Sequence, residues 1–381
     1  MQNSIPAIKR IEDRARQLPD AISLAQGIPN LSSHSLIREG VIEAIKNGKV
    51  DKYSPVPGVV ELRELISDKL AERNMPYNPD SEIIVTAGGI EALSATLLGI
   101  MEPGDEIIYP TPAYPYYDKI ITMAKGKSVQ IPFEEKDGWH LDLELLQKKI
   151  SNKTKAILIC NPNNPTGSVF SQKELMTIAS LAQQHNFYVI SDDIYENFYY
   201  GEGSIFNINT QQQFRKQIIR IVSLSKDFVL SGWRIGFINS DKENIDKILP
   251  IHDSLINCAP VVSQYAALAA LKNETQILSE YKEIYKNRRK IMGDGLETLR
   301  EYLSFSWPEG AYYFFPKIKG ATDSEKICFD ILEKVKVATV PGGDFGIGGQ
   351  GHMRLCFGKS EGEITKGIER LNTYFKNFST I

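Results

Sequence analysis

The sequence predicts an α/β protein in which a large domain carries a mostly parallel, seven-stranded sheet flanked by helices, beside a smaller α+β domain. From residue 80 to about residue 240, short β-branched runs alternate with amphipathic segments, a pattern typical of a parallel sheet covered on both faces. A long charged stretch, Asn273–Tyr302, then predicts a helix that leaves this pattern. Further strand-like runs and a closing amphipathic segment, Glu363–Phe378, predict the second unit.

Before the alternating region, periodicity predicts a helix at Ile5–Gln17, a short strand beginning at Ile22 and a helix within Gly58–Asn74. The strands predicted for the sheet are Glu82–Thr86, Glu106–Tyr109, Ser128–Pro132, Lys155–Cys160, Phe187–Ser191, Ile218–Leu224 and Ile235–Asn239. The helices predicted between them are Ile90–Met101, one after Pro115, and Ser171–Asn186. The strands predicted for the second unit are Phe305–Ile318, Val337–Val340 and Arg354–Phe357.

These elements divide the chain into a large domain, residues 41–275, and a small domain made of residues 1–40 and 276–381, joined by the long helix. The first 40 residues are assigned to the small domain because they do not fit the alternating pattern. Ligands in open α/β sheets bind at the carboxyl ends of the strands, so the residues that follow the predicted strands are the candidates for a functional site.

Composition narrows the classes of function. The 381 residues carry a net charge of −3 without a basic stripe, which argues against a nucleic-acid or membrane partner. The first residues are polar and charged, unlike a secretory signal, and the four cysteines form no CxxC pair. The five histidines have no metal-ligand spacing, so no metal is expected. We therefore expect a cytoplasmic protein.

The segment Ser223–Gly236 places Lys226 directly after a buried strand. Desolvation there should lower the pKa of the amine, and a partly neutral lysine is a nucleophile for carbonyl compounds. Ser223, Ser225 and Arg234 are residues of the kind that hold a phosphate. An amine beside phosphate donors predicts a pyridoxal phosphate site, although a surface lysine in a polar loop would fit this segment equally well by itself.

Three other segments follow predicted strands. Asn161–Gly167 (NPNNPTG) fixes its backbone with two prolines and presents Asn164, although the same residues favour an ordinary turn. Asp192 ends a buried strand and needs a cation or several donors there, or else is a helix cap or a structural ion pair; Tyr195 follows it. Thr86–Ile90 (TAGGI) offers backbone N–H groups at a helix start to an anion, unless its glycines serve only a tight turn.

In this order, TAGG, Tyr114, NPNNPTG, SDDIYE, SLSK, GWRIG and Arg354 resemble the class I/II aminotransferase family of fold type I pyridoxal phosphate enzymes. The resemblance runs from about Leu24 to Arg354. It implies pyridoxal 5'-phosphate as cofactor, an amino acid and a 2-oxo acid as substrates, ping-pong transfer of the amino group, and a homodimer with shared active sites.

The resemblance also implies roles for individual residues. Lys226 matches the lysine that forms a Schiff base with the cofactor aldehyde and later acts as a base, and Asp192 matches the acid paired with the pyridine nitrogen. The other matches are Tyr195 and Asn164 at the ring's phenolic oxygen, Tyr114 stacked on the ring, Gly88, Gly89, Ser223, Ser225 and Arg234 at the phosphate, and Tyr53 at the phosphate of the neighbouring subunit's cofactor. Arg354, with Gly27 and Asn164 beside it, matches the site for the substrate α-carboxylate.

The substrate side chain is predicted from one position. In related enzymes, a cation two residues after the first glycine of the TAGG-like loop can bind the side-chain carboxylate of aspartate, and here that residue is Ile90. A neutral, bulky or aromatic amino acid is therefore expected. The aromatic run Gly310–Phe315 is interpreted as strand core. A C–S or β-elimination lyase on the same fold remains an alternative, whereas a pyridoxal phosphate-dependent regulator of transcription is disfavoured because only about 40 weakly basic residues precede the sheet.

Overall fold

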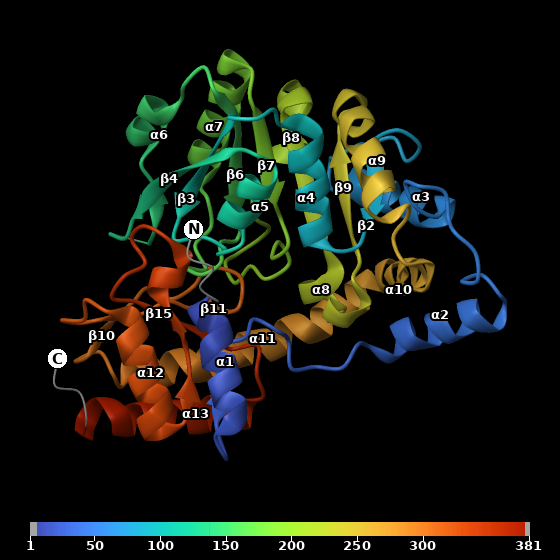
Figure 1. Cartoon of the computed structure of the whole chain (residues 1–381). Helices are drawn as coiled ribbons and strands as arrows, with labels where there is room; N and C mark the ends of the chain where they lie inside the picture. Colours follow the sequence, from blue (N-terminus) through green and yellow to red (C-terminus); the bar gives the residue numbers. More distant parts are fainter. Residues whose placement is uncertain (1–5, 137, 378–381) are drawn as a thin grey trace.

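The computed structural model describes residues 6–136 and 138–377, and the sheet is its central feature (Figure 1). Within these residues, eight strands pair in the order β2-β9-β8-β7-β6-β3-β4-β5. In chain order they are β2 (Ile83–Thr86), β3 (Glu106–Thr111), β4 (Lys127–Glu134), β5 (His140–Leu141), β6 (Thr154–Cys160), β7 (Tyr188–Asp192), β8 (Ile218–Ser223) and β9 (Gly236–Ser240).

The seven predicted strands are all present, and β5 is an addition that the sequence did not indicate. It pairs antiparallel with the end of β4. Because β5 has only two residues, it is too short for an alternating pattern to be recognised. The strands from β8 to β4 run parallel, while β9 runs antiparallel to both of its neighbours. Residues of β6, β7 and β8 are almost all buried, which explains their continuous Ile- and Val-rich sequences.

Helices cover the sheet on its faces and at one edge (Figure 1). They are α3 (Val60–Glu72), α4 (Gly89–Ile100), α5 (Tyr117–Met123), α6 (Leu143–Lys149), α7 (Gln172–His185), α9 (Lys242–Ile256) and α10 (Val261–Lys272). The start of α7 is fixed by a capping box between Ser171 and Glu174, and its end by Asn186 in the left-handed conformation. Within the described residues, no helix has the length and apolar character needed to cross a membrane.

The C-terminal unit begins after the 24-residue helix α11 (Glu274–Glu297). Its further elements are β10 (Leu303–Ser304), β11 (Tyr313–Phe314), β12 (Lys317–Ile318), α12 (Ser324–Val335), β13 (Val337–Ala338), β14 (Val340–Pro341), β15 (Met353–Cys356) and α13 (Glu361–Asn377). The prediction of a strand over Phe305–Ile318 is wrong in extent. Pro308 and Pro316 cannot donate to a ladder, and Ala311 has a φ of 55°, so only β11 and β12 form there.

The N-terminal helix α1 (Ala7–Gln17) lies beside this unit (Figure 1). Arg14 pairs with Glu333 of α12 at 2.6 Å, and β1 (Ile22–Ser23) runs parallel to β13. In contrast, α2 (Ser35–Lys46) packs against α10, so it crosses the predicted boundary at residue 40 while contacting the large unit. The division into domains at residues 40 and 275 stays a prediction. The predicted helix ends at Ile5 and Phe378 lie outside the described residues.

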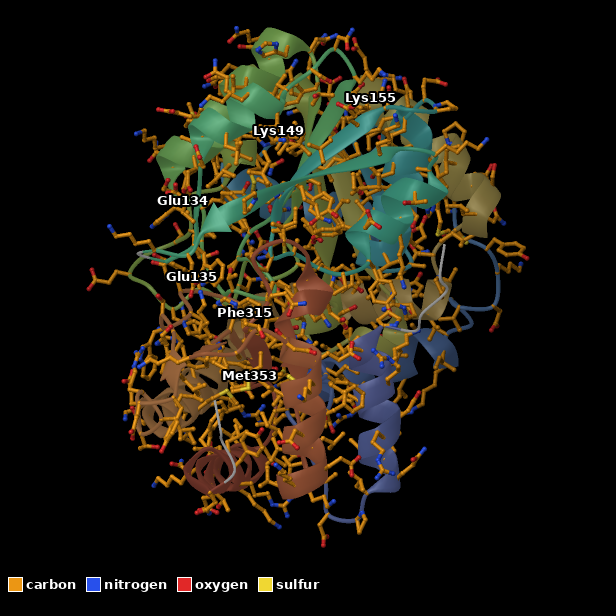
Figure 2. The ribbon with its side chains drawn as sticks, turned by 60° about the vertical axis from the view of Figure 1, so that its left-hand side comes forward. Glu134, Glu135, Lys149, Lys155, Phe315 and Met353 are labelled. Atoms are coloured by element: carbon orange, nitrogen blue, oxygen red, sulfur yellow. The ribbon has the colours of Figure 1, made fainter. Side chains whose placement is uncertain are left out.

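The sheet and the C-terminal unit meet at the end of β4. Figure 2 shows Glu135 above and to the left of Phe315, with Met353 of β15 below. The carboxylate of Glu135 is 2.9 Å from Lys317 Nζ and 3.2 Å from His352 Nε2, and the imidazole of His352 stacks on the ring of Phe315 at 4.8 Å. The imidazole hydrogen bond, together with Lys317, lowers the pKa of Glu135 to about 2. These contacts anchor the start of β15, the strand that carries Arg354.

Candidate active site

The carboxyl ends of the parallel strands open onto a cavity of about 500 Å³, which is closed from the other side by the C-terminal unit and α1. The predicted site residues that line it are Gly27, Gly89, Tyr114, Asn164, Asp192, Tyr195, Ser223, Ser225, Lys226, Arg234 and Arg354. Two predicted residues lie elsewhere: Gly88, which precedes α4, and Tyr53. Among the described residues, no cluster of His, Cys, Asp and Glu could hold a metal ion.

Lys226 lies on α8 (Leu224–Asp227), a single helical turn that begins where β8 ends. Its Nζ donates a hydrogen bond to the carbonyl oxygen of Gly27 at 2.8 Å. Burial, reinforced by the positive charges of Arg354 and Arg234, lowers the pKa of the amine to about 8. A useful fraction of the lysine is therefore neutral and nucleophilic near neutral pH, as the sequence predicts.

Asp192 ends β7 with its two carboxylate oxygens in different situations. Oδ2 accepts a hydrogen bond from the hydroxyl of Tyr117 at 2.6 Å. Oδ1 is buried and has no hydrogen-bond partner among the described residues. Burial raises the pKa of this carboxyl to about 6. A buried carboxylate oxygen without a donor, on the wall of a cavity, fits a ligand that brings a cationic N–H group.

The start of α4 is the candidate anion site. Gly88 has a φ of 86° and precedes the first turn of α4, whose free N–H groups favour an anion. Residues with a side chain rarely adopt this φ, so glycine is favoured there, and a Cβ atom would also come within 2.6 Å of Arg234 Nη2. The hydroxyl of Ser223 donates to that of Ser225 at 2.9 Å, and Arg234 Nη2 donates to the Ala87 carbonyl at 3.3 Å. Gly88 thus adjoins the candidate anion site without lining the cavity itself.

Arg354 is 3% exposed and has no carboxylate partner among the described residues. Its Nη1 donates to Asn164 Oδ1 at 2.9 Å and its Nη2 to the Ala25 carbonyl at 2.6 Å, while Nε is unpaired within those residues. The guanidinium lies over the Tyr313 ring at 4.4 Å. A buried cation held only by neutral groups fits a carboxylate ligand, because a charge is costly to bury without a counter-charge.

Several residues of the cavity were not predicted. Tyr117 holds Asp192 as described above. Tyr313, from the run interpreted as strand core, lines the cavity and shares a 2.9 Å hydroxyl contact with Tyr195, whereas its neighbours Tyr312 and Phe314 do not line it. Helix α1 also contributes a wall, through Ile8, Lys9, Glu12, Asp13 and Arg16. Tyr117 belongs to the aromatic run that begins at Tyr114, so the sequence could have identified it as a site residue. Helix α1 has no motif that points to the site.

Tyr53 is 83% exposed and lies in a separate surface hollow with Ala87 and Pro260. It therefore does not reach the cavity of its own chain. Ala87 is the residue before Gly88, so this hollow opens beside the anion site.

The fold and the cavity define a fold type I transferase, with a lysine, a carboxylate and an anion site at the carboxyl ends of a mostly parallel sheet. The chain belongs to the family described as aminotransferase class I and II, whose sequence profile matches residues 19–371. It is an aminotransferase, and enzymes of this family generally depend on pyridoxal phosphate and use amino acids and 2-oxo acids.

Similar proteins cover nearly the whole chain. An aspartate aminotransferase of Pyrococcus abyssi is 34% identical over 369 residues, which are 96% of this chain and 94% of the relative. Aromatic-amino-acid aminotransferase 2 of Thermococcus litoralis is 30% identical, covering 97% of this chain and 95% of the relative. The crystal structure of an aromatic aminotransferase from Pyrococcus horikoshii superposes with a TM-score of 0.89 at 33% identity, covering 96% and 98% of the two chains. These names differ in substrate, so the family does not assign the amino acid.

Proposed function

We propose that this aminotransferase binds pyridoxal 5'-phosphate in the cavity and transfers the amino group of a neutral, bulky or aromatic L-amino acid to a 2-oxo acid by a ping-pong mechanism. The observation that carries the proposal is that one cavity holds two buried groups and one half-buried amine, all with unfilled bonding capacity. These are the unpaired Oδ1 of Asp192, the weakly basic amine of Lys226 and the guanidinium of Arg354, which lacks a carboxylate partner among the described residues.

The residues present fit this cofactor. Gly88, Gly89, Ser223, Ser225 and Arg234 would hold its phosphate at the start of α4. Asp192 Oδ1 would accept the pyridine N–H, Tyr195 and Asn164 would hydrogen-bond the phenolic oxygen, and Tyr114 would cover the ring. When bound, pyridoxal phosphate supplies an aldehyde for the amine and a ring that accepts the charge developing at the substrate Cα.

The chain's own residues orient the substrate and move the proton. Arg354 would bind the α-carboxylate through two parallel hydrogen bonds, with Gly27 and Asn164 beside it. Once the substrate amine has taken its place, Lys226 Nζ would be free to remove the proton from Cα, and a pKa near 8 suits a general base at neutral pH. Tyr313 and Tyr117 hold Tyr195 and Asp192 in place, at 2.9 and 2.6 Å.

Lys226 should be the lysine attached to the cofactor. Borohydride reduction of the cofactor-loaded enzyme followed by peptide mapping should place the reduced cofactor on Lys226. Among the described residues, two lysines line the cavity, Lys226 and Lys9, and Lys9 is exposed. Lys9 is the internal control, since its side chain is exposed and its amine lies 6.0 Å from the centre of the Tyr116 ring. A label on any other lysine would refute the assignment.

The proposed substrate class follows from the wall that faces the side chain. Ile90, which is 46% exposed, lines the cavity together with Leu93 and Tyr116. Burial of an apolar side chain against such a wall contributes about 25 cal/mol per Å², while a carboxylate would find no buried cation there. The cations of α1, Lys9 and Arg16, are exposed, and Arg16 already has Asp13 at 3.5 Å, so they offer a side-chain carboxylate only a weak, solvated contact.

Single amino acids should distinguish transamination from elimination. An aminotransferase given only an amino acid stops after one half-reaction, so the cofactor absorption should bleach and return when a 2-oxo acid is added. We expect phenylalanine, tyrosine, methionine or leucine to bleach it faster than aspartate. Ile90→Lys is the matched variant, and it should shift the preference towards aspartate. Continuous ammonia release without an oxo acid would support the lyase instead, and a clear preference of the wild type for aspartate would refute the argument from Ile90.

We also infer a homodimer in which Tyr53 serves the partner's cofactor phosphate. The support is that Tyr53 is exposed in its own chain, in the hollow that opens beside the anion site. Closed two-fold symmetry would give two equal sites. A cytoplasmic location, expected from composition, stays a prediction.

Mixed dimers should test the shared site. A dimer of one Tyr53→Phe subunit and one Lys226→Ala subunit should contain one intact site, formed by Lys226 of the first subunit and Tyr53 of the second. Its activity should therefore exceed that of either parent dimer. If Tyr53 served its own chain, the mixed dimer would have no intact site and no such gain, and full activity of a monomer would also contradict the proposal.

A further inference from the structure

A small cavity lies behind the helical turn that carries Lys226. Lys226 lines the active-site cavity, whereas its neighbour Asp227 lines this second one together with Asn197 and Tyr200, which follow β7, and Tyr285 of α11. Its volume is about 10 Å³. A cavity needs roughly 10–15 Å³, measured in this way, to hold one water molecule.

Two buried polar atoms on its walls lack partners. Asp227 is 4% exposed and Tyr285 is 1% exposed. Among residues 6–136 and 138–377, neither Asp227 Oδ1 nor the Tyr285 hydroxyl has a hydrogen-bond partner. The other carboxyl oxygen of Asp227 accepts from Asn197 Nδ2 at 2.6 Å. Buried polar groups are almost always paired in native proteins, either with protein atoms or with ordered water.

We infer that this cavity binds one ordered water, which bridges Asp227 Oδ1 and the Tyr285 hydroxyl. A buried water requires two to four polar partners, and Asp227 Oδ1 and the Tyr285 hydroxyl supply two. The two atoms do not bond each other directly, and both residues line this cavity, so one intervening molecule would satisfy both. Burial also raises the pKa of Asp227 well above its ordinary value, and a neutral carboxyl can either donate to or accept from this water.

The bridge would fix Lys226 from its backbone side. Asp227 ends the single turn of α8, and the water ties that turn to α11. The ring of Tyr285 stacks on Tyr312 at 5.8 Å, and the Tyr312 hydroxyl donates to the Gly27 carbonyl at 2.9 Å. The same carbonyl accepts from Lys226 Nζ at 2.8 Å. Asp227 and Tyr285 are therefore positioning residues for Lys226, an assignment that rests on the proposed role of that lysine.

A high-resolution crystal structure of the cofactor-loaded enzyme tests the water site directly. It should show a density peak within hydrogen-bond distance of both Asp227 Oδ1 and the Tyr285 hydroxyl. The same peak should be lost in Tyr285→Phe, which keeps the ring and its stacking. A wild-type structure without the peak overturns the inference, whatever the role of Lys226.

Coupling between the two residues is the second test. Tyr285→Phe should lower the urea midpoint of the cofactor-free enzyme. This decrease should be less than half as large in an Asp227→Ala background, because the bridge is already gone there. Tyr281→Phe is the matched control: Tyr281 lines the same cavity, but its hydroxyl donates directly to the Ser32 carbonyl at 3.2 Å. Its effect should be equal in both backgrounds. Equal effects of Tyr285→Phe in both backgrounds would overturn the bridge.

The positioning role needs a readout of Lys226 itself. In Tyr285→Phe, the pH midpoint of the cofactor–lysine absorption should shift, while in Tyr281→Phe it should not. An unshifted midpoint in Tyr285→Phe would overturn the positioning role. Failure of borohydride to label Lys226 is a separate outcome, because it would overturn the proposed function and leave the water density and the coupling as they are.

Discussion

Replacing Lys226 with alanine should reduce turnover by about 10⁴-fold, the upper end of what a positioned general base contributes, because this residue would also supply the amine that attaches the cofactor. Binding of the cofactor should largely survive, since the anion site at α4 and Asp192 do not involve the lysine. The measurements are the rate of a single half-reaction and the cofactor retained after gel filtration. Loss of turnover with retained cofactor is the expected pair of results.

Lys226→Arg is the control that separates charge from chemistry. Arginine keeps a positive charge in the cavity but cannot be deprotonated in a protein, so this variant should be as inactive as Lys226→Ala. In the wild type, burial lowers the pKa of Lys226 to about 8. The rate of cofactor attachment should therefore rise about tenfold for each unit by which the pH increases towards 8, and it should level off above pH 8. An active arginine variant, or attachment that is independent of pH below 8, would contradict the assignment.

The part of the site that lies at strand ends could be predicted from the sequence. Asp192 ends a buried strand, Lys226 and Asn164 follow buried strands, and parallel strands bring their carboxyl ends to one edge of the sheet. Local chemistry and topology agree at these positions. This agreement explains why Asn164, Asp192 and Lys226 meet in one cavity, even though Asn164 and Lys226 are 62 positions apart in the chain.

The remainder depends on tertiary packing that leaves no local signal. Helix α1 lines the cavity because it packs against α12, more than 300 residues away, and an amphipathic pattern does not say which partner covers its apolar face. The aromatic run that contains Tyr313 satisfies the description of a core strand, and only the turn at Ala311 and the two prolines decide which rings face the cavity. Likewise, Tyr53 lies outside the cavity of its own chain.

Replacing Asp192 with asparagine should lower turnover and, above the pKa of the buried carboxyl, raise the stability of the cofactor-free enzyme. An amide cannot balance the pyridine N–H cation, and the loss of one preorganised electrostatic contact costs roughly 2.7–4 kcal/mol, or about 10²–10³-fold in rate. Near-normal turnover in this variant would show that another group keeps the ring protonated. Tyr117→Phe should have a smaller effect, because it removes only the 2.6 Å bond to Oδ2 and leaves the charge.

The stability change has a defined pH dependence. Burial raises the pKa of Asp192 to about 6 from 3.8, so the folded, cofactor-free protein holds the proton more tightly than the unfolded chain. The stability linked to that proton is fully present below pH about 4 and is lost as the pH rises through about 6. Asparagine does not titrate, so the free energy of unfolding of Asp192→Asn should move in the variant's favour by up to about 3 kcal/mol across this window.

Asp193→Asn is the matched control for that measurement, because Asp193 is the adjacent and equally buried carboxylate but already has a cation. Its Oδ2 is 2.6 Å from Arg220 Nε. Replacing it should destabilise the protein, since the buried guanidinium of Arg220 then keeps only Glu196, at 2.6 Å, as a charged partner. Urea denaturation of the cofactor-free proteins at pH 4 and pH 8 decides between the two behaviours. If Asp192→Asn gains no stability relative to the wild type at the higher pH, Asp192 is already paired in the empty site and its free oxygen is not kept for a cationic ligand.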